Sequence, residues 1–170
     1  MTFTVETDYT SGNMAVMARA LRKTLRKRRS RRFHVFGWVV TALAAALLAA
    51  AGPAFDLRTV VTLAAMAAIV LALLFEDRIN GYVAKRRMLP GMERAEAVFT
   101  EEGFTSATEI GRTEWRYDKI LLVAETEDFF VFIFSTNHAQ LYDKRNLRGG
   151  TAEEFRRFLE ERTGKAVQPV

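Results

Sequence analysis

Two long uncharged stretches dominate the pattern of hydrophobic and polar positions along the chain. Residues 33–55 and 59–75 contain no Asp, Glu, Lys or Arg, and Asp56 and Arg58 lie between them. As α-helices these stretches would be about 35 and about 25 Å long, against a hydrocarbon core of about 30 Å. A backbone inside lipid must satisfy its own hydrogen bonds, which only a helix does within one segment. The pattern therefore predicts a transmembrane helical hairpin over residues 33–75.

Alanine-rich apolar helices also occur as buried core helices of soluble proteins. A chain of 170 residues would have difficulty burying two helices that are apolar on every face. Gly52-Pro53 provides a break between the helices, and Trp38 and Phe55 stand where interfacial aromatic residues collect. We therefore predict that the two helices, at approximately residues 34–53 and 58–75, form the membrane hairpin.

The segments on either side of the hairpin have weaker patterns. Residues 1–32 predict a short strand followed by a basic amphipathic helix, whose apolar stripe recurs at spacings of three and four as Met14, Met17, Leu21 and Leu25. Residues 76–92 predict a connecting helix that ends at Pro90-Gly91.

From Glu93 onward the period changes to that of short strands. The six consecutive apolar residues at 129–134 would place large side chains on both faces of a sheet, so that one face needs a helix to cover it. A final helix fits this need, because Thr151 and Glu154 have the spacing of a capping box and Gly164 can end it. Residues 93–170 thus predict a small antiparallel sheet closed by a C-terminal helix, and the chain as a whole an α+β membrane protein.

The distribution of charge predicts an orientation. The sequence pI is about 9.8, yet residues 1–33 carry nine Lys or Arg against two acids, residues 34–75 one of each, and residues 76–170 15 against 17. Positive charge flanking short spans stays on the cytoplasmic side. Both termini should therefore be cytoplasmic, with the protein in the inner membrane and a short turn outside.

The residues that carry chemistry are sparse. Cysteine is absent, only His34 and His138 represent histidine, and no glycine-rich phosphate loop occurs. Neither histidine stands near a nucleophile or a metal-ligand partner in the sequence. We predict no catalytic residues, no metal and no cofactor. The basic run has no interleaved aromatic residues and adjoins the membrane, so we also predict no nucleic-acid partner.

Two groups of basic residues are candidate contacts for anionic lipid or another anion. One lies on the basic helix and the other after the last predicted strand: Arg22, Lys23, Arg26 and Lys27, then Lys144, Arg145 and Arg148. The alternative for the first group is that it only sets topology. Small residues in the spans (Ala42, Ala46, Ala49, Ala65 and Ala68) permit close helix packing or homo-oligomers through the hairpin.

Motifs in residues 99–158 resemble the YcxB-like family of bacterial membrane proteins. They occur in the family's order: Phe99-Thr100-Glu101-Glu102-Gly103, Trp115 with Asp118-Lys119-Ile120, the Phe-rich segment 129–134, Lys144-Arg145, and Glu154-Phe155. The resemblance extends to the whole element order, and it implies a C-terminal domain similar to bacterial pleckstrin-homology-like (PH-like) domains. It implies no catalytic residues.

These observations predict a non-catalytic inner-membrane protein that displays a cytoplasmic interaction or sensory domain to a protein partner. The alternative is a sensor of anionic lipid headgroups at the inner leaflet.

Overall fold

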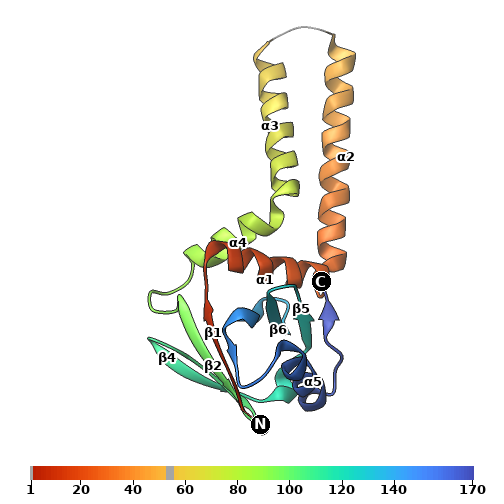
Figure 1. Cartoon of the computed structure of the whole chain (residues 1–170). Coiled ribbons are helices and arrows are strands. Elements are labelled where there is room, and N and C mark those ends of the chain that lie inside the picture. The colour runs from red at the N-terminus through yellow and green to blue at the C-terminus, as the bar shows by residue number, and fades with distance from the viewer. Residues whose placement is uncertain (1, 53–55) are drawn as a thin grey trace.

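The structure is a computed structural model, and it describes residues 2–52 and 56–170. Figure 1 shows three levels: a tall helical hairpin, a layer made of α1 (Ser11–Lys23) and α4 (Glu76–Arg86) across its base, and a β domain beneath that layer. Pro53 and Phe55, which the sequence analysis places at the turn of the hairpin, lie outside the described residues.

The hairpin consists of α2 (Lys27–Ala51) and α3 (Leu57–Leu74). Both helices are long and apolar enough to cross a membrane, and only 11% and 6% of their most apolar windows are buried. The predicted hairpin is thus present, but its first helix begins at Lys27 rather than near residue 34, because the basic run continues the same helix. Asp56 caps α3 by accepting a hydrogen bond from the backbone N–H of Thr59 at 2.8 Å.

The first sheet takes strands from both sides of the hairpin. It is antiparallel, in the order β4 (Gly111–Trp115), β3 (Phe104–Thr108), β2 (Arg94–Phe99), β1 (Phe3–Asp8) and β8 (Leu147–Arg148). Strand β1 lies between β2 and β8, with Phe3 opposite Phe99 and Val5 opposite Leu147. The N-terminal strand, predicted as part of residues 1–32, is therefore an internal strand of the β domain.

The second sheet has the order β7 (His138–Asp143), β6 (Phe129–Ser135), β5 (Leu122–Glu125) and β9 (Gln168–Pro169). Strand β9 runs parallel to β5, whereas the other neighbours are antiparallel. Short 3-10 turns at Tyr117–Lys119 and Lys144–Asn146 join strands of the two sheets. The prediction of one antiparallel sheet is thus corrected to two sheets, one of them mixed. The strands β8 and β9 have two residues each, too few to produce a period in the sequence.

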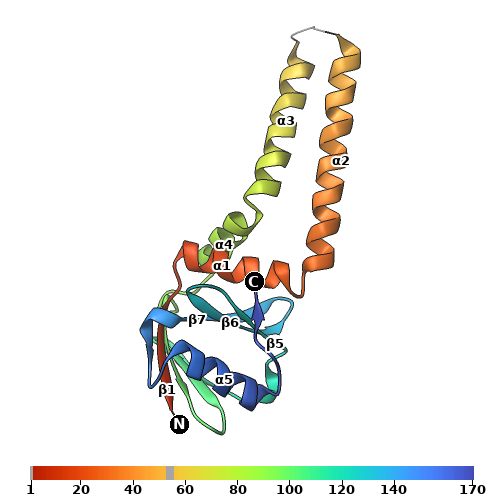
Figure 2. The ribbon, with the colours of Figure 1, turned by 45° about the vertical axis from the view of Figure 1, so that its right-hand side comes forward.

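The aromatic core explains why β6 is apolar on both faces. Phe130 and Phe132 point to a core shared with the first sheet and α5 (Ala152–Thr163), and the alternate residues Phe129, Val131 and Ile133 pack under α1. The predicted last helix, α5, thus covers one face of β6, and α1 covers the other (Figure 2).

The details of α5 confirm its predicted ends. Thr151 and Glu154 form the capping box, and Gly164 ends the helix in the left-handed region at φ 65°.

Candidate functional site

The basic helix α1 is held on the β domain by its apolar stripe. Thr10 caps it by accepting from the backbone N–H of Asn13, and its apolar side chains Met14 and Leu21 are buried. Ala20 and Leu21 pack on the outer face of the second sheet. Leu25, the last residue of the predicted stripe, is 39% exposed because α1 has already ended at Lys23. The basic residues of α1 consequently point away from the sheet.

A close crossing fixes α1 against α4. A Cβ on Gly81 would lie 2.4 Å from the backbone nitrogen of Ala15, so only glycine allows this approach. Beside the crossing, Arg22 donates two hydrogen bonds of 2.7 Å to the carboxylate of Asp77, and Arg19 lies 3.6 Å from it. The hydrogen bond to Asp77 raises the pKa of Arg22 above its ordinary value.

Glu76 connects the first turns of α2 to α4. Its Oε2 accepts a hydrogen bond of 3.0 Å from the buried hydroxyl of Ser30 and lies 2.8 Å from Nε2 of His34. The guanidinium Nε of Arg22 lies 3.9 Å from the same oxygen. Three helices therefore meet at one carboxylate, directly below the apolar part of the hairpin.

The chain bends sharply between α1 and α2. Thr24 ends α1, its hydroxyl donating to the carbonyl of Ala20 at 2.6 Å, and the backbone N–H of Arg26 donates to the carbonyl of Leu21 at 2.9 Å. Helix α2 then leaves the layer at a steep angle to α1 (Figure 1). The concave side of this bend, closed by strand β9, is hollow.

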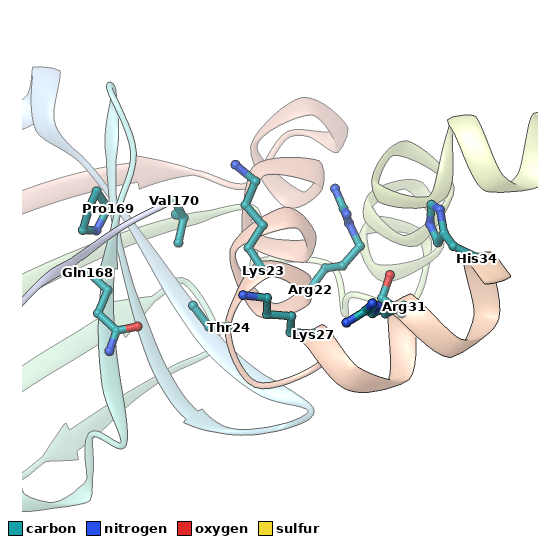
Figure 3. Close-up of a pocket in the computed structure, with 10 residues that line it drawn as sticks. Arg22, Lys23, Thr24, Lys27, Arg31, His34, Gln168, Pro169 and Val170 are labelled. Atoms are coloured by element: carbon teal, nitrogen blue, oxygen red, sulfur yellow. The ribbon is translucent and has the colours of Figure 1, made fainter.

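This hollow, which we call the basic groove, has a volume of about 760 Å³. Figure 3 shows His34 and four cationic side chains that line the groove, with residues 168–170 on the opposite wall; the cationic side chains are Arg22, Lys23, Lys27 and Arg31. No aspartate or glutamate is among the described residues that line it. In the described part of the chain, Lys23, Lys27 and Arg31 form no ion pair, in contrast to Arg22. The groove can therefore attract an anion of small-molecule size.

Of the four candidate residues predicted near α1, the groove contains Arg22, Lys23 and Lys27. Arg26 points elsewhere: it donates to the carbonyl of Thr136 at 2.7 Å and to Oδ1 of Asn137 at 2.9 Å, in the turn between β6 and β7. It fastens the α1–α2 bend to the β domain.

The basic residues of the second predicted group pair with acidic residues of the β domain. Lys144 donates to Glu125 at 2.6 Å, and Arg145 donates to Asp143 at 2.9 and 2.6 Å. Arg148 lies 3.7 Å from Glu6. Each cation therefore has a carboxylate within the β domain that would compete with an external anion.

These pairs change the pKa values of the acids. Burial raises the pKa of Glu125, but the hydrogen bonds from Arg156 and Lys144 outweigh it, so that the pKa is lowered. Burial likewise raises the pKa of Asp143, and the hydrogen bonds from Arg145 bring it below the ordinary value.

Sequence reasoning missed Ser30, Arg31 and His34 as parts of one site. Their spacing was a usable signal, because Lys27, Arg31 and His34 fall on one helical face once α2 is known to begin at Lys27. Residues 168–170 gave no signal, since only the parallel pairing of β9 with β5 brings them to the groove.

Other chemistry-bearing residues lie in structural surroundings. The ring of His138 packs 5.3 Å from that of Trp115. The described residues contain no group of three or more His, Cys, Asp or Glu side chains that could hold a metal ion.

Comparison with known proteins gives one match. The family described as YcxB-like protein matches residues 99–159, which extend from the last residue of β2 through most of α5. The chain matches no curated protein and no solved structure. The matched region contains the motifs on which the sequence resemblance is based, including Trp115 and the Phe-rich strand β6. Over residues 99–159 the chain is therefore similar to the YcxB-like family, as its sequence predicts.

Proposed function

We propose that this chain is a non-catalytic, two-span protein of the inner membrane that displays its β domain on the cytoplasmic side. The observation that carries the proposal is the exposure of α2 and α3, whose most apolar windows are only 11% and 6% buried. Phe36 and Leu47, for example, are 69% and 65% exposed. A continuous apolar surface of this extent favours association in water but is matched by the hydrocarbon of a bilayer.

The positions of the charges support the orientation. Basic residues gather at the base of the hairpin, in the first turns of α2 (27–32) and at the end of α4 (85–87). At the opposite end of the hairpin, Arg58 is the one basic residue of the sequence. Since positive flanks remain in the cytoplasm, the base, the β domain and both termini would face the cytoplasm.

The layer of α1 and α4 suggests how the β domain would work. The Gly81 crossing and the Arg22–Asp77 pair hold α1 and α4 together as this layer. The hydrogen bond from Ser30 to Glu76 attaches the layer to α2 of the hairpin, while α1 also packs on the second sheet. The β domain would therefore have one fixed orientation at the membrane surface, which suits a module that presents a face to a protein partner. Two sheets closed by α5 support the finer part of the proposal, a PH-like fold.

Self-association through the hairpin belongs to the same proposal. Ala42, Ala46 and Ala49 are exposed on α2 rather than packed against α3, so their small side chains are available to a second copy.

Recognition of anionic lipid headgroups is a second candidate function. The observation that favours it is the basic groove, whose Lys23, Lys27 and Arg31 have no acidic partner among the described residues. The group at Lys144, Arg145 and Arg148 gives less support, because Glu125, Asp143 and Glu6 already pair with it.

Cysteine labelling tests the placement cleanly, because the chain contains no cysteine. Leu57→Cys puts a thiol at the start of α3, and Glu102→Cys puts one in the turn between β2 and β3. In spheroplasts, a membrane-impermeant maleimide should label the Leu57→Cys variant, and it should label the Glu102→Cys variant only after lysis. Labelling of the Glu102→Cys variant before lysis, or recovery of the chain in the soluble fraction, would overturn the proposal.

A further inference from the structure

The basic groove lies where the surface of α2 changes from charged to apolar. Lys27, Arg31 and His34 line it, and Trp38 is the next residue along the same helical face. Trp38 is 50% exposed. A ligand in the groove would thus have cationic side chains at one end and an apolar indole ring at the other.

The groove keeps a net positive charge because the nearby acidic residues are already paired with other side chains. Asp77 is held by both guanidinium bonds of Arg22, and Glu76 is engaged by Ser30 and His34. Lys23, Lys27 and Arg31 are therefore the unneutralised cations, and no described acid reaches any of them.

We infer that the basic groove binds the phosphate-bearing headgroup of an anionic phospholipid, whose acyl chains extend along Trp38. The inference rests on the proposed membrane placement, since it needs the groove to open at headgroup level. The volume of about 760 Å³ exceeds what a single phosphate needs and lies within the range of about 300–1,000 Å³ typical of ligand pockets. The amide of Gln168 adds an uncharged polar group for the rest of a headgroup.

A soluble phosphate ester has the same anionic group but no chains to place against an apolar surface. The position of the exposed Trp38, one helical turn beyond the lining residue His34 on the same face of α2, is what favours a lipid as the source of the phosphate.

Trp38 also provides the measurement. The chain has two tryptophans, so a Trp115→Phe variant, which keeps an aromatic ring at that position, leaves Trp38 as the one indole. The full-length variant would be reconstituted in phosphatidylcholine nanodiscs that contain a fixed fraction of phosphatidylglycerol. Bromine on the acyl chains of one lipid at a time quenches an indole that is adjacent to that lipid. We expect brominated phosphatidylglycerol to quench Trp38 several-fold more than brominated phosphatidylcholine at equal mole fraction.

Two matched double variants separate the groove from general surface charge. Lys27→Ala/Arg31→Ala removes two groove cations, while Arg28→Ala/Arg32→Ala removes the same charge at the same depth on a different face of α2. Because each basic residue contributes about 1 kcal/mol to the attraction of an anionic headgroup, the first variant should bring the quenching ratio of the two lipids close to one, whereas the second should keep most of the several-fold preference. Lys27→Gln/Arg31→Gln, which keeps long side chains, should behave like the first variant.

The outcomes distinguish this inference from the proposal on which it rests. Equal quenching by both lipids, or equal losses in the two alanine variants, would overturn the groove as a lipid site while leaving the membrane placement intact. Loss of the preference on adding millimolar glycerol phosphate would assign the groove to a soluble phosphate compound and also overturn the inference. If neither brominated lipid quenched Trp38, the membrane placement itself would fail.

Discussion

Phe36 on α2 and Phe99 on β2 show that a phenylalanine side chain has very different surroundings in the hairpin and in the β domain. Phe36 is 69% exposed, whereas Phe99 is fully buried and its ring lies within 6 Å of the rings of Phe104, Phe132, Tyr142 and Phe155. In the β domain the protein supplies its own apolar surroundings. In the hairpin the surroundings must come from outside, so apolar composition alone does not distinguish a core from a membrane segment.

The junction between the two regions differs from both of them, because it is polar and also closely packed. Arg22, Ser30, His34, Glu76 and Asp77 join three helices through ion pairs and hydrogen bonds rather than through apolar burial. Buried polar groups require specific partners, so the junction fixes the angle between hairpin and β domain more narrowly than an apolar contact would.

The largest effect on stability should come from removing one aromatic ring from the core of the β domain. Phe99→Ala removes a ring that four others contact, and it should lower the free energy of unfolding of the domain by about 3–5 kcal/mol. The matched change Phe36→Ala should leave that unfolding transition nearly unchanged. Denaturant titration of the full chain in detergent, followed by near-ultraviolet circular dichroism, measures both. Similar losses in the two variants would mean that hairpin and β domain unfold as one apolar unit.

A charge placed on the hairpin should have the next largest effect. Leu63 is 45% exposed on α3, and Leu63→Arg should make membrane insertion less favourable by about 2.5–3.5 kcal/mol. Thr113→Arg on β4, where the side chain is also exposed, is the control and should insert normally. The fraction that resists alkaline extraction of membranes measures insertion. Normal retention of the Leu63→Arg variant would indicate that α3 does not face lipid.

The junction can be tested at its closest approach. Gly81→Ala would place a Cβ 2.4 Å from the backbone of Ala15, and since a backbone cannot rotate away, α1 and α4 must separate at a cost of about 1–3 kcal/mol. At Gly37 the neighbour is the flexible side chain of Leu73 at 2.9 Å, so Gly37→Ala should cost less. Gly111→Ala, with open space around the new methyl group, is the control. Limited proteolysis between α4 and β2 should become faster in the Gly81→Ala variant alone.

Much of this architecture was predictable because its signals are local. The hairpin follows from unbroken apolar runs, the ends of α5 from Thr151, Glu154 and Gly164, and the two-sided strand β6 from six adjacent apolar residues. Each of these signals lies within one continuous segment of the sequence.

What could not be predicted depends on pairing between distant parts of the chain. Strand β1 reaches its place beside β2 across the whole hairpin, and β9 reaches the basic groove through a parallel pairing of two residues. The groove itself exists because the chain bends at residues 24–26, where the sequence continues in basic residues without Gly or Pro. The pairing of Lys144 with Glu125 could not be predicted from the sequence either, because no local pattern relates these two residues.

The smallest predicted effect concerns this last pairing and its dependence on pH. The carboxylate of Glu125 accepts from Lys144 at 2.6 Å and from Arg156 at 2.7 and 2.8 Å, and its pKa is held below the ordinary value near 4.5. A carboxyl group with a lowered folded pKa stabilises the fold at pH values above its unfolded pKa. That contribution is lost as the pH falls through the folded pKa.

We therefore expect the free energy of unfolding of the β domain to decline as the pH is lowered from 6 to 3. Glu125→Gln should cost about 1 kcal/mol at pH 7 and flatten part of that decline, whereas Glu102→Gln in an exposed turn should do neither. Denaturant titrations across this pH range measure both quantities. An unchanged pH profile in the Glu125→Gln variant would show that the Lys144–Glu125–Arg156 cluster is not a net source of stability. Lys144 would then be available to an external anion, as Lys23, Lys27 and Arg31 of the basic groove are.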